Sequence, residues 1–347
     1  MKTYCLNMIV FAMILSIQSG IAQTLSSQDL DYYESQNSTL SNELELYFDN
    51  EKPEYHSIER KNALYLVDAI THYPKPHNNA IKDLFLNRYR KSLESIRETK
   101  VDSGLVIWNI YNMSYIVKTP EITVAFDLVI LPDCMIKDND ESIHKNIMKE
   151  IVELCDVLFV SHNHGDHMDL FVTREFLSKN KPVITHTGIF EGEDFYDQLT
   201  HWKRDGNKSK FNIPNVNKEI TLRIYPGHQA ISPDAAIDNN FTVVTFPNNI
   251  TIAHSGDQSW KHDFEWIDAV KKDVDIDVLL INTWAEQPDR LIVGLDPNII
   301  LPGHINEMDH TISHREPYWK SYRLWKNGGD KVVHLFWGEK FCYNREE

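Results

Sequence analysis

The chain has 347 residues, of which 42% are hydrophobic and 25% are charged, the composition of a globular protein large enough to bury a core. Its formal net charge of −16 argues against nucleic acid or an anionic membrane as a partner, because both attract basic surfaces. The four cysteines have no paired spacing, so a disulfide scaffold is excluded as the source of stability.

The first 22 residues have the features of a secretory signal peptide. Lys2 provides a basic start, an apolar run extends from Leu6 to Ile17, and Gly20 and Ala22 form a small-residue cleavage site. The run is too short for a membrane-spanning helix, which needs about 20 apolar residues. We therefore expect cleavage after Ala22, a periplasmic or secreted protein, and no stable membrane span.

Residues 23–100 are predicted to form a helical extension. Apolar residues recur at three- and four-residue spacing over 63–70 and again over 79–98. From residue 101 onward, short β-branched and aromatic runs alternate with turn residues, a pattern that predicts strands. The chain is therefore divided into a signal peptide (1–22), a helical extension (23–100) and a main domain (101–347).

The main domain contains a dense group of metal-binding side chains directly after one apolar run. Residues 156–160 predict a buried strand, and His162, His164, Asp166 and His167 follow it. Imidazole nitrogens and carboxylate oxygens are ligands that zinc and iron favour. A loop at the end of a core strand can direct them into one small volume. This spacing predicts a metal site rather than a polar turn that happens to be rich in histidine.

Three later strand-like runs also end on a residue that can bind a metal ion. They lead to His228, Asp257 and His304, each beside a proline or glycine that lets the backbone approach a site closely. Any one of the three alone is more typical of an ordinary loop. Their order along the chain, each at the end of a strand-like run, is what indicates a metal site.

The seven candidate ligands, in this order, resemble the signature of the metallo-β-lactamase superfamily. The resemblance covers roughly residues 104–340. It implies a four-layer αββα sandwich of the α+β class, here with the N-terminal helical extension. Within the superfamily, the motifs resemble the branch that contains L-ascorbate-6-phosphate lactonase and N-acylphosphatidylethanolamine phospholipase D. Gln229 and Gln258 depart from that branch near the substrate, so neither substrate is carried over.

The resemblance implies two divalent metal ions, zinc in the first place and manganese or iron as alternatives. His162, His164 and His228 would bind one ion, Asp166, His167 and His304 the second, and Asp257 would bridge both. A metal-bridging hydroxide would then hydrolyse an ester, lactone or phosphodiester bond of a small molecule or lipid. A bridging aspartate argues against a penicillin-degrading enzyme, because those members lack it.

Further roles are expected from position alone. Asp166 and Asp257 are predicted to be catalytic as well as metal-binding, and His254 is a candidate proton donor, with a structural role as the alternative. Asp127 is expected either to orient a metal-bound histidine or to be an ordinary turn residue. A helix is predicted from Met308 to Trp325, with His310 and His314 on its surface, and a last strand over 332–337.

Two other functions are considered. The first is a non-catalytic metal-binding or sensing protein of the same fold, against which the complete ligand set argues. The second is a non-heme iron oxidoreductase, which calls for a flavodoxin-like partner domain that the pattern after the last predicted strand does not indicate. The sequence does not predict the oligomeric state.

Overall fold

The computed structural model describes residues 27–50, 53, 57–72, 78–136 and 141–345. The expected signal peptide, residues 1–22, lies outside the described residues. Among the helices that are described, none combines the length and the apolar character needed to cross a membrane.

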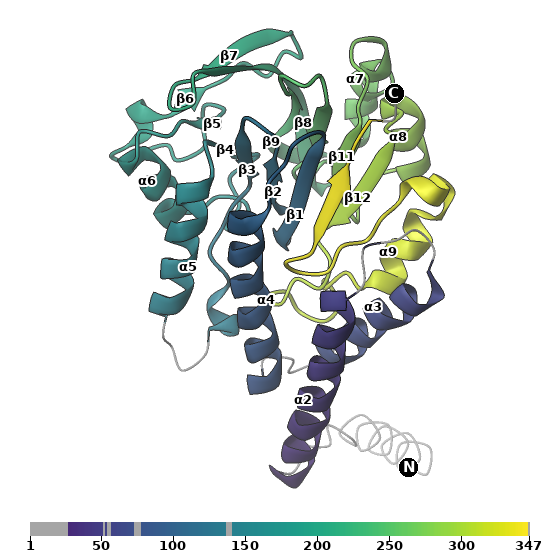
Figure 1. Cartoon of the computed structure of the whole chain (residues 1–347). Coiled ribbons are helices and arrows are strands. Elements are labelled where there is room, and N and C mark those ends of the chain that lie inside the picture. Colours follow the sequence, from purple (N-terminus) through teal and green to yellow (C-terminus); the bar gives the residue numbers. More distant parts are fainter. Residues whose placement is uncertain (1–26, 51–52, 54–56, 73–77, 137–140, 346–347) are drawn as a thin grey trace, which may run out of the picture.

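Two mixed β-sheets lie face to face at the centre of the described chain (Figure 1). The first sheet has the order β13 (Lys340–Tyr343), β1 (Leu105–Tyr111), β2 (Ser114–Lys118), β3 (Thr123–Phe126), β4 (Val157–Phe159), β5 (Val183–Thr185) and β6 (Thr200–His201). The second has the order β12 (Ile299–Gly303), β11 (Val278–Asn282), β10 (Thr251–His254), β9 (Ala235–Thr245), β8 (Lys218–Ser232) and β7 (Ser209–Ile213).

Both faces of the sheets are apolar, so each sheet needs cover on two sides. Between the sheets, Ile107, Val117 and Val124 belong to the same buried cluster as Leu222 and Leu280. Because successive side chains of a strand point to opposite faces, the residues between these positions form the outer faces. Those outer faces must be covered by helices if they are to be removed from water.

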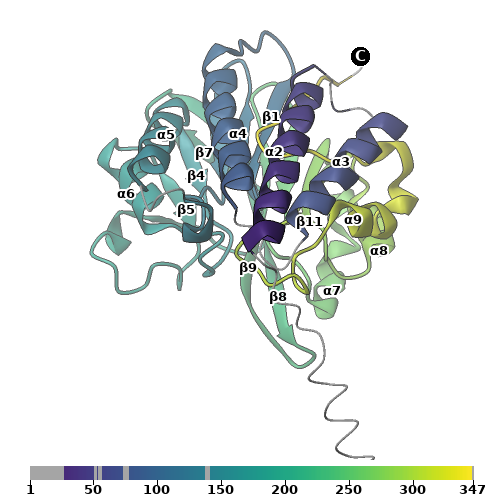
Figure 2. The ribbon, with the colours of Figure 1, turned by 90° about the horizontal axis from the view of Figure 1, so that it is seen from below.

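Helices cover the two outer faces and complete four layers (Figure 2). On the first sheet lie α2 (Ser27–Asn50), α3 (Ile58–Thr71), α4 (Asn79–Glu98), α5 (Glu141–Leu154) and α6 (Leu170–Ser178). On the second lie α7 (Phe264–Ile267) and α8 (Pro288–Leu295), while α9 (Tyr318–Leu324) packs against α3. The predicted αββα sandwich with an N-terminal helical segment is therefore confirmed.

The N-terminal helices share the core of the first sheet. Leu64 of α3 and Phe85 of α4 are buried in the same cluster as Trp108 of β1. The Phe85 ring lies 4.5 Å from the Trp337 ring, measured between centroids. Helices α3 and α4 are thus part of the helical layer of this sheet, and their burial contributes to the stability of the whole sandwich.

A buried ion pair ties α3 to the C-terminal part of the chain. Arg60 donates to Glu339 over 3.1 Å and 2.5 Å and to the carbonyl of His334 over 2.6 Å. Only 1% of the Arg60 side chain and 3% of the Glu339 side chain are exposed. Glu339 also accepts the backbone N–H of Phe336. Two opposite charges this deeply buried are tolerated only because each has the other as a partner.

Two predicted elements differ from the structure. Residues 332–337 are not a strand of the described sheets: Val333 and Leu335 face the space between the sheets, whereas Phe336 and Trp337 lie in the cluster beneath α3 and α4. The segment therefore crosses from one sheet to the other, and the last described strand is β13. The predicted helix from Met308 to Trp325 is reduced to α9, because Pro317 occupies its N-cap position and residues 305–317 form a loop with other partners.

We expect Arg60→Met to lower the free energy of unfolding by about 3–5 kcal/mol, because Glu339 would remain buried without its partner. Urea denaturation followed by circular dichroism measures the change. The double variant Arg60→Met/Glu339→Leu should recover most of the loss. Lys210→Met, which breaks the exposed pair with Glu219, is the matched control and should leave the midpoint unchanged. Equal midpoints for Arg60→Met and Lys210→Met would contradict the assignment.

Candidate metal centre

Six of the seven predicted ligands come together at one edge of the sandwich, where β4, β10 and β12 end. His162, His164, Asp166 and His167 follow β4 in one loop, whose turn is closed by bonds from the N–H groups of His167 and Met168 to the carbonyl of His164. Asp169 then caps α6 by accepting the N–H of Val172 over 3.0 Å. The capped helix fixes the end of the loop, so its side chains are held toward the opposite sheet.

Four of the predicted ligands converge on one point. The group consists of Asp166, His167, Asp257 and His304. His167 Nε2 lies 3.1 Å from Asp166 Oδ2, 3.2 Å from Asp257 Oδ1 and 3.0 Å from His304 Nε2. His304 Nε2 lies 2.8 Å from Asp257 Oδ1 and 3.5 Å from Asp166 Oδ2. Two imidazole nitrogens and two carboxylate oxygens thus face one small volume from three loops.

These separations fit a bound cation. Tetrahedral zinc with bonds of about 2.0–2.1 Å places neighbouring ligand atoms about 3.3 Å apart. The five distances within this group run from 2.8 to 3.5 Å. The donor set of two histidines and two carboxylates is also one that zinc, manganese or iron accepts.

A second group shares Asp257 with the first. It comprises His162, His164 and Asp257, whose ligand atoms lie within 4.8 Å of one another. His162 Nε2 is buried without a hydrogen-bond partner in the described chain and lies 3.7 Å from Asp257 Oδ2. A buried imidazole nitrogen aimed at a carboxylate in this way fits a metal ligand. Asp257 therefore presents one oxygen to each group, as a bridging ligand would.

Gly256 makes the position of Asp257 possible. Its φ of +51° lies in the left-handed region, and a Cβ there would meet Asn239 Oδ1 at 2.1 Å and Ser161 Cβ at 2.6 Å. Only glycine combines this backbone angle with so close an approach to the neighbouring loop. Asn239 Oδ1 also accepts the N–H of Asp257 over 3.1 Å. The bridging carboxylate is thus fixed from the backbone.

The structure does not bring His228 into either group. Its Nδ1 lies 2.8 Å from Asp263 Oδ1, and its Nε2 lies 3.5 Å from Asp238 Oδ1. A carboxylate on one ring nitrogen is the arrangement by which proteins orient metal-binding histidines, so His228 stays the predicted third ligand of its ion. The neighbouring Gln229 contacts the centre directly, donating to Asp257 Oδ2 over 2.9 Å.

Solved structures that resemble this chain include two named hydrolases. Igni18, a metallo hydrolase from Ignicoccus hospitalis, matches 70% of this chain and 100% of its own at 14% identity and a TM-score of 0.51. The isothiocyanate hydrolase from Delia radicum gut bacteria matches 69% of this chain and 99% of its own at 14% identity and a TM-score of 0.50. The metallo-β-lactamase fold protein YhfI from Bacillus subtilis aligns over 69% of this chain at 10% identity and a TM-score of 0.44. No family model and no curated protein matches the sequence.

The chain has the metallo-β-lactamase fold. The two-sheet sandwich, its helical cover and the strand-end position of the ligand groups together support the sequence resemblance. The likeness at this identity concerns the fold alone. The narrower resemblance to the lactonase and phospholipase branch stays a prediction.

The charges of the centre favour cation binding. Burial and the neighbouring His167 lower the pKa of His162 to about 3, so that its ring is neutral and offers a lone pair. Burial alone would lower the pKa of His304, but the carboxylates of Asp257 and Glu307 raise it to about 10. Burial would raise the pKa of Asp257, but His167 and His304 hold it well below its usual range. A cation that binds must displace protons from His304, so metal affinity should weaken as the pH falls.

Buried carboxylates orient two of the ligands in this fold. Asp127 Oδ2 lies 2.7 Å from His167 Nδ1, and Asp127 also accepts from Ser161, the contacts expected of the orienting role. Glu307 Oε2 lies 2.7 Å from His304 Nδ1. In both cases the carboxylate holds the far ring nitrogen, so that Nε2 is directed at the metal site.

Sequence reasoning missed Glu307 and Asn112. Asn112 donates to Asp166 Oδ2 over 3.1 Å and to Glu307 Oε1 over 3.2 Å, and so connects the two ligand loops. The signal for Glu307 was its place three residues after His304, beyond a chain reversal. No local pattern marks Asn112, which lies in the turn between β1 and β2, far from any ligand in sequence.

His254 does not have the geometry of a proton donor to substrate. Its Nε2 lies 3.0 Å from the carbonyl of Met113, which can only accept, and its Nδ1 accepts the N–H of Gly256. The ring also stacks on Phe126 with centroids 5.0 Å apart. Both nitrogens are therefore used within the buried structure. We correct the expected catalytic role to the structural alternative.

An open cleft of about 340 Å³ leads to the centre. Besides the ligands His164, Asp166, Asp257 and His304, it is lined by Gln229, Trp284, His310, Ser313, His314 and Glu316. His310 and His314 were predicted on a helix surface, but they lie in the loop 305–317 and face this cleft. The helical pattern did not predict the structure here, because contacts with Asp68 and Arg315 hold this segment in another conformation.

Helix α3 holds both ends of the loop 305–317. Asp68 accepts from Asn306 Nδ2 over 2.8 Å and from the backbone N–H groups of Tyr318 and Trp319 over 2.9 and 3.0 Å. Burial raises the pKa of Asp68 to about 6 despite these donors. One wall of the cleft therefore depends on the N-terminal helical segment.

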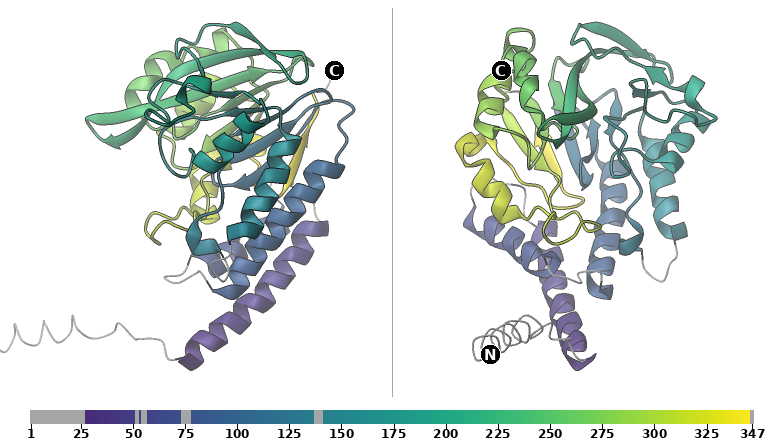
Figure 3. Two further views of the ribbon diagram at one scale, coloured as in Figure 1. Left: turned by 90° about the vertical axis from the view of Figure 1, so that its left-hand side faces the viewer. Right: turned by 180° about the vertical axis from the view of Figure 1, so that it is seen from behind.

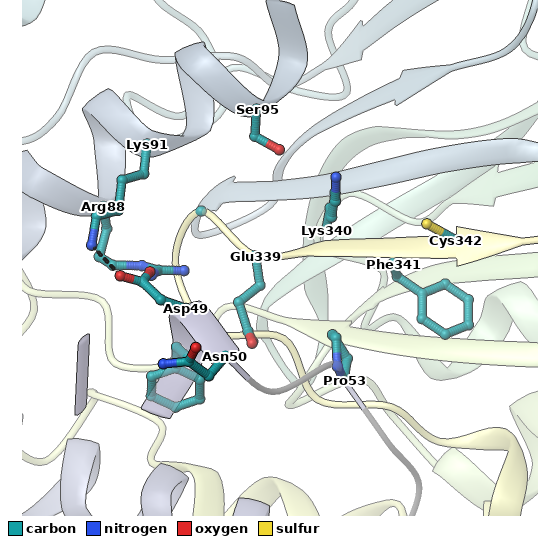
Figure 4. Close-up of a pocket in the computed structure, with 12 residues that line it drawn as sticks. Asp49, Asn50, Pro53, Arg88, Lys91, Ser95, Glu339, Lys340, Phe341 and Cys342 are labelled. Atoms are coloured by element: carbon teal, nitrogen blue, oxygen red, sulfur yellow. Dashed lines mark hydrogen bonds and ion pairs between the residues drawn. The ribbon is translucent and has the colours of Figure 1, made fainter. Parts of the chain in front are cut away.

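A larger cavity of about 470 Å³ lies elsewhere, between α2, α4 and β13 (Figure 4). On its wall, Arg88 pairs with Asp49 at 3.0 Å and Lys91 with Asp49 at 2.7 Å, and Glu339 pairs with Arg60 behind the wall. Lys340 donates to Thr99 Oγ1 over 3.1 Å. These contacts engage most of the charged groups of the cavity in holding the helices to the last strand. The metal centre and its cleft are the site where chemistry is expected.

We expect Asp127→Asn to weaken metal binding about 10–100-fold, because His167 would lose the carboxylate that orients it. Competition with a chromogenic chelator measures the affinity. Asp156→Asn is the matched control, since Asp156 also accepts a backbone N–H beside β3 but does not contact a ligand histidine. Equal affinities for the two variants would argue against the orienting role.

The raised pKa of Asp68 predicts a pH-dependent contribution to stability. The folded chain holds this proton more tightly than the unfolded chain does, so the stability contributed by Asp68 is fully present below about pH 4 and is lost as the pH rises through about 6. The urea midpoint of the wild type, relative to that of Asp68→Asn, should therefore decrease between pH 4.5 and 7. A relative midpoint that rises over this range would have the opposite sign and contradict the assignment.

Proposed function

We propose that this protein is a dinuclear metal-dependent hydrolase that cleaves an ester, lactone or phosphodiester bond of a small molecule or lipid. The observation that carries the proposal is the position of Asp257, whose Oδ1 faces His167 and His304 while its Oδ2 faces His162. One carboxylate shared by two groups of nitrogen donors is what a pair of neighbouring cations requires. Zinc is the expected ion, with manganese or iron as alternatives.

Two divalent cations in such a site lower the pKa of a shared water enough to supply hydroxide near neutral pH, and they polarise the bond under attack. The residues of this chain would supply the rest. Asp166, whose side chain is 20% exposed, lies between His167 and the open cleft and can accept a hydrogen bond from the attacking water. Gln229 holds Asp257 and so fixes the bridging carboxylate.

The cleft supports a substrate of small-molecule size or one end of a lipid. Its volume is about 340 Å³, at the lower end of the range in which proteins bind small ligands. Trp284 lies edge-on to His304 with centroids 5.6 Å apart and gives the cleft an apolar wall beside the second ion. The alternatives of a metal sensor or an iron oxidoreductase would use the same ligands. We favour hydrolysis because the likeness in fold reaches named hydrolases at TM-scores of 0.50 and 0.51.

The proposal predicts two metal ions per chain in the protein expressed from the full sequence. Elemental analysis should find them in the wild type and find fewer in Asp257→Ala, which removes the shared carboxylate. Asp156→Asn is again the control and should keep both. The metal-loaded wild type should then hydrolyse at least one member of a panel of esters, lactones and phosphodiesters, and Asp257→Ala should lose that activity. Full metal content without hydrolysis of any class would favour the sensor interpretation.

A further inference from the structure

The loop 305–317 places the imidazole of His310 at the cleft, and buried hydrogen bonds fix the backbone of this loop. At its base, the N–H of Asn306 donates to the carbonyl of Glu316 over 2.8 Å. Inside it, Arg315 is 4% exposed and donates to three carbonyls: Glu307 at 3.2 Å, His310 at 2.7 Å and Thr71 of α3 at 2.8 Å. A buried guanidinium that spans the loop and α3 fixes the backbone at Glu307 and at His310.

Glu307 connects His310 to the metal centre. Its Oε2 lies 2.7 Å from His304 Nδ1 and 3.2 Å from His310 Nδ1. The carboxylate is 2% exposed, whereas the His310 side chain is 43% exposed and lines the same cleft as His304. The same carboxylate therefore orients one imidazole that binds a metal ion and a second one that faces the substrate space.

We propose that His310 is a catalytic residue that donates the proton to the leaving group, on the side of the cleft next to His304. This inference rests on the hydrolytic function proposed above. His310 Nδ1 lies 3.2 Å from Glu307 Oε2, and the ring borders the cleft, into which Nε2 would deliver the proton. Such an arrangement of a histidine and an orienting carboxylate suits general acid catalysis, which commonly contributes about 10²–10⁴-fold to the rate.

The proton balance of the step is complete. Hydroxide adds to the carbonyl carbon or the phosphorus, and a new bond to oxygen forms. The bond to the leaving oxygen then breaks, its electron pair stays on that oxygen, and the oxygen takes the proton from His310 Nε2. His310 regains a proton from solvent, to which its partly exposed ring has access.

His314 provides a matched comparison on the same rim. It lies one turn further along the loop, where its N–H donates to the carbonyl of Thr311 over 2.9 Å, and it also lines the cleft. Of these two histidines, His310 is the one whose ring contacts Glu307. A role that needs the orienting carboxylate is therefore expected for His310 and not for His314.

The test compares leaving groups. The probes are 4-nitrophenyl and phenyl butyrate, together with bis(4-nitrophenyl) and diphenyl phosphate, given to the metal-loaded wild type, His310→Gln and His314→Gln. Phenolate gains from protonation as it leaves, whereas 4-nitrophenolate is stable without it near neutral pH. His310→Gln should lower kcat for the phenyl substrate about 10²-fold, change kcat for the 4-nitrophenyl substrate little, and keep KM and metal content. His314→Gln should not discriminate between the leaving groups.

Several outcomes would overturn the proposal. An equal loss of kcat on both leaving groups would show that His310 contributes no proton, and a loss of bound metal in His310→Gln would show a structural role. If His314→Gln discriminated between the phenyl and 4-nitrophenyl substrates as strongly as His310→Gln, the effect would not depend on the contact with Glu307. A wild type that holds two metal ions but hydrolyses neither series, nor any other substrate class in the panel, would overturn the hydrolytic function itself and this inference with it.

Discussion

The structure depends on gathering several buried charges and imidazoles at one edge of a β-sandwich. Asp257 lies within 2.8–3.7 Å of three histidine rings that come from two different loops, and it is 1% exposed. Carboxylates and imidazoles are this deeply buried only where each finds a partner or a metal ion. The sandwich supplies the apolar support, and buried carboxylates such as Asp127 and Glu307 set the direction of the rings.

Because each buried charge needs a partner, residues beyond the candidate ligands also take part in the network. Asp127 holds Ser161 and His167 at the end of β3, while Asn112 joins Asp166 to Glu307 across two loops. These residues come from elements that are distant in the sequence but end at the same edge. Removal of one partner would leave a neighbouring charge buried, so the network is expected to respond as a unit rather than residue by residue.

The N-terminal helices take part in the site through the loop 305–317. Asp68 and the carbonyl of Thr71, both on α3, hold the ends and the middle of this loop, and Arg60 on the same helix anchors the C-terminal segment through Glu339. In the left view of Figure 3, the purple and blue N-terminal helices lie on the side of the molecule away from the projecting green hairpin of β8 and β9. The helical layer thus stabilises the first sheet and also shapes a wall of the cleft.

The sequence alone determined the class of fold and predicted the candidate ligand residues. His162, His164, Asp166 and His167 lie within six residues, so their common location follows from local spacing, and the order of His228, Asp257 and His304 is recorded in the chain itself. The strand before this motif was equally clear, because a short run of β-branched and aromatic residues between turns has few other interpretations.

Tertiary structure decided what depends on partners from elsewhere in the chain. Residues 308–317 have a helical pattern, yet Arg315 and Asp68 hold them in a loop that brings His310 to the cleft. The apolar run 332–337 has a strand pattern, yet it crosses between the sheets because both of its faces are buried against different layers. The structural role of His254 depends on a hydrogen-bond partner more than a hundred residues away in the chain, and such a partner leaves no periodic pattern in the sequence. The contact of Glu307 with His304 was missed for a similar reason, because it forms across a chain reversal.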